Sequence, residues 1–312
     1  MNFDLGPDEL ALRDGIRDLC VGRFPMERVR GGFDRWMWTE LGEAGVFSLR
    51  LSESEGGVGL GMTEAVIVFE ELGRALVPGP LVATHLAAGL VEGASTGGKV
   101  VTAVDFDSRA DVVGLVEFGI ESDLALVLDD SVSVTADLPD GEPQRPLDPL
   151  TPVMRWKGFG GREVGPADPQ RLRREGAVLT AALSSGIASK LVDLAVAYAN
   201  ERQQFDRPIG SFQAVKHMCA DMFVRAEVAR AAVDAAGVLM DEDDPDVANA
   251  VATAKLLASE AAIANGKTCV QVHGGMGFTW EVDVHLYLKR AAVLATHFGN
   301  TDTHSESMAG AL

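Results

Sequence analysis

The chain has 312 residues, 47% of them hydrophobic, which is enough for a buried core in one large domain or two smaller ones. Its net charge of −19 argues against a nucleic acid or an anionic membrane as partner, because phosphate groups attract lysine and arginine. The three cysteines are far apart and lie in apolar helical patterns, which disfavours a disulfide framework or a zinc site. The first residues lack the basic and apolar parts of a signal peptide, and no apolar run is long enough to cross a bilayer, so we expect a soluble, cytosolic protein.

The first region, residues 1–95, has the periodicity of helices. Pro7 is typical of a first helical turn, where its missing N–H would have no partner. A glycine-rich stretch, residues 55–61, follows no clear strand and lacks a full dinucleotide-binding pattern, so we interpret it as a tight loop. A later helix is predicted to end before Pro78, and its apolar face is formed by Ala65, Phe69, Leu72 and Leu76.

The middle region, residues 96–166, has the β-branched composition of short strands separated by turn residues. A hairpin is predicted where Leu124–Leu128 is followed, across two aspartates, by the alternating residues Ser131–Thr135. Residues 136–149 are rich in proline and aspartate and are predicted to form a loop. We therefore expect a small β subdomain, with Trp156 on a late strand. The first three strands are predicted at residues 100–104, 112–116 and 124–128.

The last region, residues 167–312, is predicted to be helical throughout and to form a four-helix-type bundle. Between the second and third long helices, Asp244 is placed to cap the third helix and Pro245 to occupy its first position. This third helix is predicted to run from Val247 to the pair Gly274-Gly275. The first long helix has a core-facing stripe formed by Leu183, Ile187, Leu191, Leu194 and Tyr198.

Two segments of this region contain residue types suited to a ligand site, RQQFDRPIGSFQ from Arg202 to Gln213 and VQVHGGMGF from Val270 to Phe278. An arginine offers a planar fork for phosphate oxygens. Glycines allow a backbone to approach a bulky ligand, and the amide of Gln271 can donate and accept hydrogen bonds. Spacing alone favours structural interpretations instead: a salt bridge of Arg202, a glycine helix cap and a surface glutamine.

These two segments resemble the paired C-terminal signatures of the acyl-CoA dehydrogenase family, Arg-x-x-Phe-Gly…Phe-Gln and Gln-x-x-Gly-Gly-x-Gly. In that family both segments contact FAD across a subunit interface. The resemblance covers most of the chain in the family's order and implies a mainly α fold: an N-terminal helical domain, a middle β subdomain that is truncated here, and a C-terminal bundle. It implies an FAD-dependent oxidoreductase without a metal site. The residues it assigns to FAD are Arg202, Phe205, Gln213, Gln271, Gly274 and Gly275.

Two departures from the family pattern concern the chemistry. The glycine after Arg-x-x-Phe is Asp206 here, which places a negative charge where a pyrophosphate would lie. The position of the family's catalytic glutamate, counted from the second signature, is occupied by Phe298, which cannot abstract a proton. An alternative glutamate position in the family falls next to Glu175. We interpret Glu175 as an ion pair of the preceding arginines at 171, 173 and 174, and His297 as a further, weaker candidate for the base.

The segment ending in Lys289-Arg290-Ala291 is similar to that of actinobacterial dehydrogenases of steroid side-chain catabolism. Those enzymes are α2β2 heterotetramers, and one of the two chains often lacks the glutamate. The resemblance implies that this chain completes an FAD site shared with a second acyl-CoA dehydrogenase-like subunit, which binds the acyl-CoA and supplies the base. Two alternatives stay open: a structural or acyl-CoA-binding subunit without activity, and a homomeric dehydrogenase that uses Glu175.

Overall fold

The computed structural model describes residues 5–105, 114–136, 138, 141–156, 161–164 and 167–310. The chain forms two compact units. The helical unit comprises residues 1–26, 66–77 and 177–312, and the mixed unit comprises residues 27–65 and 78–176. Two helices, α4 (Met62–Arg74) and α6 (Pro169–Glu201), contribute residues to both units.

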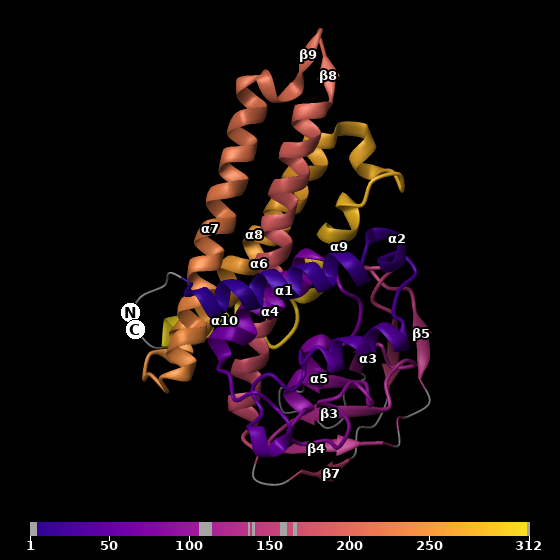
Figure 1. Cartoon of the computed structure of the whole chain (residues 1–312), viewed down its shortest axis with the longest axis vertical. Helices are drawn as coiled ribbons and strands as arrows, with labels where there is room; N and C mark the ends of the chain where they lie inside the picture. The colour runs from indigo at the N-terminus through magenta and orange to yellow at the C-terminus, as the bar shows by residue number, and fades with distance from the viewer. Residues whose placement is uncertain are drawn as a thin grey trace. The chain divides into compact units, whose positions relative to one another are not determined.

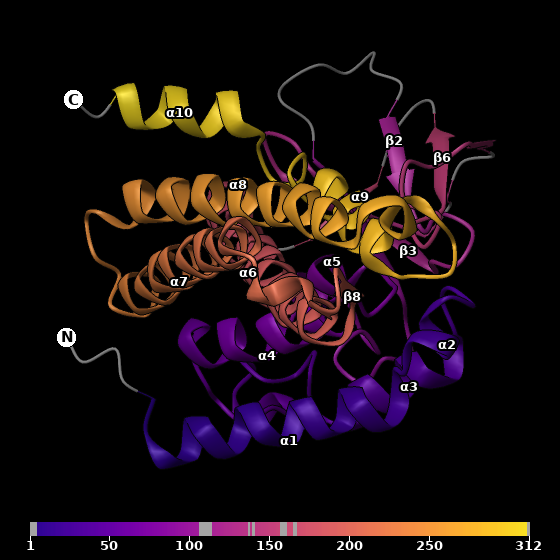
Figure 2. The same cartoon turned by 90° about the horizontal axis from the view of Figure 1, so that it is seen from above.

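The helical unit is built on three long helices, α6, α7 (Gln213–Asp241) and α8 (Val247–His273), which lie side by side (Figure 1). The short strands β8 (Gln203–Gln204) and β9 (Arg207–Pro208) form a hairpin between α6 and α7, at one end of the bundle. Figure 2 shows α7 and α10 (Thr301–Gly310) on opposite sides of α8. The unit also contains α1 (Pro7–Arg23), η2 (Ile209–Ser211), η3 (Gly274–Phe278), α9 (Val284–Leu294) and α10 (Thr301–Gly310).

Small residues and one buried amide hold these helices together. Gly73 on α4 and Gly186 on α6 lie against the backbone of the facing helix, at Leu183 and Glu70, so that a β-carbon at either glycine would clash. The fully buried amide nitrogen of Asn265 on α8 donates to the carbonyl oxygens of Ala188 (3.1 Å) and Met222 (2.9 Å). The same side chain accepts from Arg225 at 3.0 Å, which satisfies its remaining group.

The mixed unit combines short helices with two small sheets. The first sheet has the order β1-β3-β4-β7 with β1 parallel to β3, and the second is the antiparallel sheet β2-β6-β5. Trp156, Met154 and Val116 are buried together with Val104 and Ala125 from the first sheet. The helices are α2 (Met26–Val29), α3 (Arg35–Glu43), η1 (Glu53–Glu55) and α5 (Leu81–Ala87). The strands are β1 (Val101–Asp105), β2 (Gly114–Glu117), β3 (Leu124–Leu128), β4 (Val132–Thr135), β5 (Glu142–Gln144), β6 (Val153–Trp156) and β7 (Arg162–Glu163).

The mainly α fold with a small middle β region and a helical C-terminal bundle is confirmed. The hairpin is confirmed as the antiparallel pair β3–β4, and α8 ends as predicted before Gly274. Of the predicted strand at residues 112–116, positions 112 and 113 lie outside the described residues. The predicted domain boundaries near residues 95 and 166 stay predictions.

Two local predictions were wrong. The predicted loop at 136–149 contains β5, because its residues Glu142–Gln144 pair with β6 despite the central proline. Helix α8 begins at Val247 as predicted, but Asp244 does not cap it and Pro245 is not its first residue. The N-cap is Asp246, and the Asp244 carboxylate accepts from the N–H of Asp246 at 2.8 Å in the turn before the helix.

By length and composition alone, α6 and the segment from Val247 to Phe278 are apolar enough to cross a membrane. In α6, 78% of the most apolar window is buried inside the protein, as in the core helix of a bundle, and in the second segment 44% is buried. The cytosolic location stays a prediction.

Candidate cofactor-binding site

The two signature segments meet at one end of the helical bundle. The rings of Tyr198, near the end of α6, and His273, the last residue of α8, are stacked with centroids 4.1 Å apart and planes 21° from parallel. The Tyr198 hydroxyl donates to the carbonyl oxygen of His273 at 3.5 Å. Arg202 follows Tyr198 by one helical turn, and Gln271 and Gly274 flank His273. The contact therefore joins the two segments that the sequence placed at a common site.

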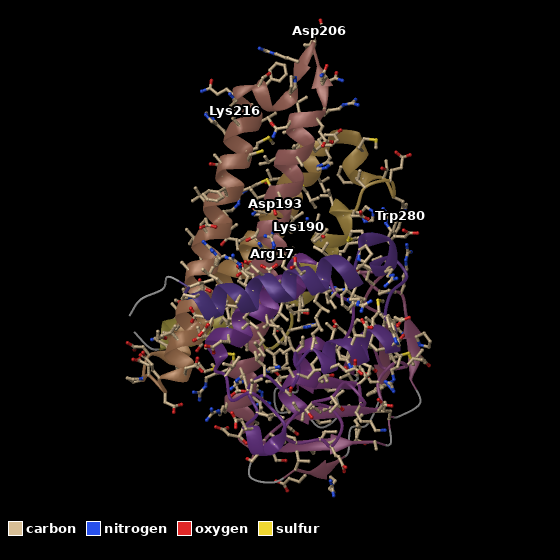
Figure 3. The ribbon with its side chains drawn as sticks, viewed as in Figure 1. Arg17, Lys190, Asp193, Asp206, Lys216 and Trp280 are labelled. Atoms are coloured by element: carbon tan, nitrogen blue, oxygen red, sulfur yellow. The ribbon has the colours of Figure 1, made fainter. Side chains whose placement is uncertain are left out.

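The first segment folds into a tight hairpin with Asp206 at its tip (Figure 3). Its two central residues, Phe205 (φ 54°) and Asp206 (φ 61°), are both left-handed, as a type I′ hairpin turn requires. Aspartate tolerates this conformation better than most residues, which explains how it can replace the family's glycine here. The Phe205 ring is 85% exposed and contacts the edge of Phe212, while the guanidinium of Arg207 lies 4.1 Å from the centroid of Phe212.

The second segment begins where α8 ends. Gly274 has φ 59° and ψ −139°, a conformation available essentially to glycine alone, and its N–H donates to the carbonyl of Gln271. A β-carbon at Gly277 would lie 2.6 Å from the carbonyl oxygen of Val270, so this glycine is required by packing. By contrast, open space surrounds the positions where Gly274 and Gly275 would carry a β-carbon. The helix-cap interpretation of Gly274 is thus correct, and the backbone beside it stays accessible.

The polar side chains of the site are also accessible. The side chains assigned to FAD by sequence are all exposed, and so are the two glycines. Within the described part of the chain, the Arg202 guanidinium has no carboxylate within salt-bridge distance, contrary to the salt-bridge interpretation. Arg207, and Lys216 in the first turn of α7 (Figure 3), add positive charge at this end of a strongly acidic chain. The exposed residues are Arg202, Phe205, Gln213, Gln271, Gly274 and Gly275.

Glu175 lies in the mixed unit, buried and held by two arginines. Arg50 donates to both carboxylate oxygens at 2.9 Å, and Arg171 donates at 3.0 Å. Burial alone would raise the pKa of Glu175, but the hydrogen bonds and charges of Arg50 and Arg171 hold it below its ordinary value. Arg171 was expected from the sequence, whereas Arg50 was not, because it is 125 residues away. Arg173 instead pairs with Asp105 at 2.8 Å. This geometry favours a structural ion pair.

Phe298 lies in the turn between α9 and α10. Its φ is 49° and that of Gly299 is 93°, and the ring nitrogen Nε2 of His304 lies 3.0 Å from the carbonyl oxygen of Phe298. Lys255, buried on α8, donates to the carbonyl oxygen of Leu294 at 2.8 Å, where α9 ends. His297, the further candidate for the base, is half-buried. No group of three or more histidine, cysteine or acidic side chains suited to a metal ion occurs among the residues placed by the structure.

Comparison with known proteins places these features in a family. Residues 6–96 match the acyl-CoA dehydrogenase N-terminal domain, and residues 171–312 match the acyl-CoA dehydrogenase C-terminal domain. The chain is 38% identical over 280 residues to acyl-CoA dehydrogenase IpdE2 of Mycobacterium tuberculosis, covering 83% of this chain and 81% of the relative. The chain belongs to the acyl-CoA dehydrogenase family. It is also 36% identical, over 87% of its own residues, to acyl-CoA dehydrogenase FadE34 of the same species, but spans only 41% of the length of that relative.

Solved structures share the whole acyl-CoA dehydrogenase fold. A chain of the ChsE4-ChsE5 complex from Mycobacterium tuberculosis aligns with a TM-score of 0.86 and 23% identity, over 99% of this chain and 98% of that one. A chain of the Tcur3481-Tcur3483 steroid ACAD G363A variant aligns with a TM-score of 0.85 and 21% identity, over 98% of both chains.

Proposed function

We propose that this chain is one subunit of a heteromeric, FAD-dependent acyl-CoA dehydrogenase and completes a flavin site held mainly by a second, related subunit. One observation carries the proposal: the residues that match the family's flavin signatures are gathered and exposed at one end of the bundle, while Phe298 occupies the expected position of the base. A chain that keeps groups for binding the cofactor but lacks the proton-abstracting group is suited to act together with another chain.

The residues present fit the adenosine-pyrophosphate side of FAD. The exposed guanidinium of Arg202 can bind phosphate oxygens through two parallel hydrogen bonds. The open space at Gly274 and Gly275 lets the backbone approach the cofactor closely. The amide of Gln271 can bind either donors or acceptors. Two exposed acidic residues, Glu201 and Asp206, oppose an anionic group at this end, and Arg207, next to Asp206, offsets part of their charge.

When bound, FAD would supply the acceptor for the hydride of the acyl β-carbon. Removal of the α-proton needs a base within hydrogen-bond reach whose pKa is close to the working pH. Phe298 has no such group, and both oxygens of Glu175 are occupied by arginines that keep it ionised. We therefore assign the base and most of the acyl-CoA binding to the partner subunit, and cofactor binding to this chain.

The structural neighbours support the partner and the substrate class. The ChsE4-ChsE5 complex and the Tcur3481-Tcur3483 protein each combine two differently named chains. The second is a steroid ACAD, which supports a CoA ester with a steroid-linked side chain as the substrate. The partner in this proposal is a second acyl-CoA dehydrogenase-like chain of the same organism.

The test is the flavin content per chain, from the visible absorption spectrum, of this protein purified alone and in the complex isolated through an affinity tag on it. We expect no flavin in the lone chain and a stoichiometric amount in the complex. Arg202→Ala and Gln271→Ala should lower the flavin content of the complex. Arg28→Ala and Gln170→Ala, which change exposed residues of the same types in the mixed unit, serve as controls and should not change it.

The alternatives predict different results. A homomeric dehydrogenase would bind a full complement of flavin alone, bleach it with an acyl-CoA and lose this activity in Glu175→Gln. A structural subunit would leave flavin content and turnover of the complex unchanged in Arg202→Ala and Gln271→Ala.

A further inference from the structure

We infer that the stacked pair Tyr198–His273 is a positioning device that sets the distance between the two halves of the phosphate-binding surface, Arg202 on one side and Gln271 with Gly274 on the other. This inference rests on the proposed function. Neither residue belongs to the groups assigned to the cofactor, so the pair would act on the flavin through its neighbours.

On the α6 side, Tyr198 lies in the last turn of the helix. Its carbonyl oxygen accepts from the N–H of Arg202 at 2.9 Å, which closes the last turn. The carbonyl of Arg202 in turn accepts from the N–H of Ile209 at 2.8 Å, beyond the hairpin. The backbone of Arg202 is thus fixed on both sides while its side chain stays exposed, and Tyr198 is the aromatic anchor one turn below it.

On the α8 side, His273 is buried and its ring is fixed in orientation. Its Nδ1 donates to the carbonyl oxygen of Cys269, one turn earlier on the same helix, at 2.8 Å. This bond turns the face of the imidazole toward the Tyr198 ring. The last carbonyls of a helix have no partner within the helix, and the Tyr198 hydroxyl satisfies that of His273. The end of α8, from which Gly274 departs, is therefore capped by a residue of α6.

The position of the stack explains its effect. Each ring lies within one helical turn of a residue assigned to the cofactor, so a change in the contact moves Arg202 relative to Gln271 and Gly274. Bidentate binding of phosphate depends strongly on such distances, because both hydrogen bonds must be aligned together.

A double-mutant cycle tests this inference on the complex isolated through this chain. The dissociation constant of FAD is measured by fluorescence quenching after removal of the flavin. Four proteins are compared: the unaltered complex, Tyr198→Leu, Arg202→Ala and the double variant. We expect Tyr198→Leu to weaken FAD binding about tenfold, and to have little further effect once Arg202 is absent, because coupled residues are not additive. Tyr198→Phe, which keeps the ring, should retain most of the affinity.

Additive effects of the two substitutions, or FAD binding unchanged by Tyr198→Leu, would overturn the positioning role while the proposed function stood. If Arg202→Ala itself left FAD binding unchanged, the proposed function would fail and this inference with it. Thermal unfolding of each complex checks that the chain is folded. Should Tyr198→Leu not fold, His273→Ala removes the same stack from the other helix and takes its place in the cycle, with His273→Phe as the ring-preserving control.

Discussion

Lys255 is fully buried, and its Nζ reaches the carbonyl oxygen of Leu294 at 2.8 Å, at the end of the helix that precedes Phe298. Burial lowers the pKa of Lys255 to about 7. The amine therefore holds the end of α9 in a form that is largely uncharged above neutral pH.

This lysine should make the chain more stable as the pH rises. Between pH 7 and about 10.5 the unfolded chain carries a proton on Lys255 that the folded chain lacks, so the free energy of unfolding increases with pH, by at most about 1.4 kcal/mol per unit. Lys255→Met removes the titrating group and should flatten that increase. Urea denaturation between pH 7 and pH 10 measures it. Equal slopes in the two proteins would contradict the prediction, and Lys267→Met, which changes an exposed lysine on the same helix, is the control.

The carboxylates of Glu70 and Asp234 should make the free energy of unfolding decrease with rising pH, in a pH range below that of Lys255. Burial, and then the charge of Asp234, raise the pKa of Glu70 to about 7, and burial raises the pKa of Asp234 to about 6. Folding stabilises the protonated acids, so the stability that these two groups contribute is fully present below their unfolded pKa values of 4.5 and 3.8 and is lost as the pH rises through about 7 and 6.

Glu70→Gln should therefore stabilise the chain by about 1–3 kcal/mol at pH 8 and by much less at pH 5. A glutamine can still accept the hydrogen bond that Ser185 donates to Glu70 at 3.1 Å. Chemical denaturation at the two pH values gives the difference. Glu227→Gln, which removes the more exposed partner of Arg230, should show no such gain.

The ion-pair chain around Glu71 offers a comparison of buried and exposed charges within one network. Arg17 donates to both oxygens of the buried Glu71, at 2.9 and 2.5 Å, and Arg74 lies 3.7 Å from it while binding the exposed Asp193 at 2.6 Å. Arg17 and Asp193 are labelled in Figure 3. Glu71→Gln should cost about 3 kcal/mol, because it leaves arginines without their buried counterion. Asp193→Asn should cost less than about 1 kcal/mol, and a reversed order in thermal unfolding would refute this ranking.

Asp206, at the hairpin tip, combines a left-handed backbone with a negative charge, and two substitutions distinguish the effects of these two properties. Asp206→Gly removes the cost of a left-handed residue and should stabilise the chain by up to about 1 kcal/mol. Under the proposed function, Asp206→Gly and Asp206→Asn should both strengthen FAD binding by the complex, since both remove a negative charge near the phosphates. Only the glycine variant should also raise the thermal midpoint. Unchanged FAD binding in both variants would show that Asp206 lies away from the cofactor.

The sequence was sufficient where local chemistry decides the structure. The end of α8 could be predicted from Gly274, because essentially only glycine adopts the backbone conformation found there. The β3–β4 hairpin could be predicted from the alternating side chains that follow the two aspartates of its turn. It was insufficient where distant residues meet. Arg50 and Glu175 are separated by 125 positions, and no spacing rule connects them. Tyr198 matched a core-facing stripe by periodicity, yet the structure shows a half-buried ring stacked on His273. The sequence of strand β5 has no apolar alternation that could have predicted it. The strand is recognised only because its residues pair with β6.

The amide of Asn265 has a consequence for how this bundle can change over evolution. Alanine is the most frequent residue on the buried faces of α6, α7 and α8, and where alanines meet, sliding one helix by a turn would exchange one methyl group for another at little cost. Asn265 removes that freedom, because such a slip would break its bonds to Ala188 and Met222 together. Substitutions among the alanines can then accumulate without loss of helix alignment, whereas insertion of a single residue in α7 would move Met222 out of reach.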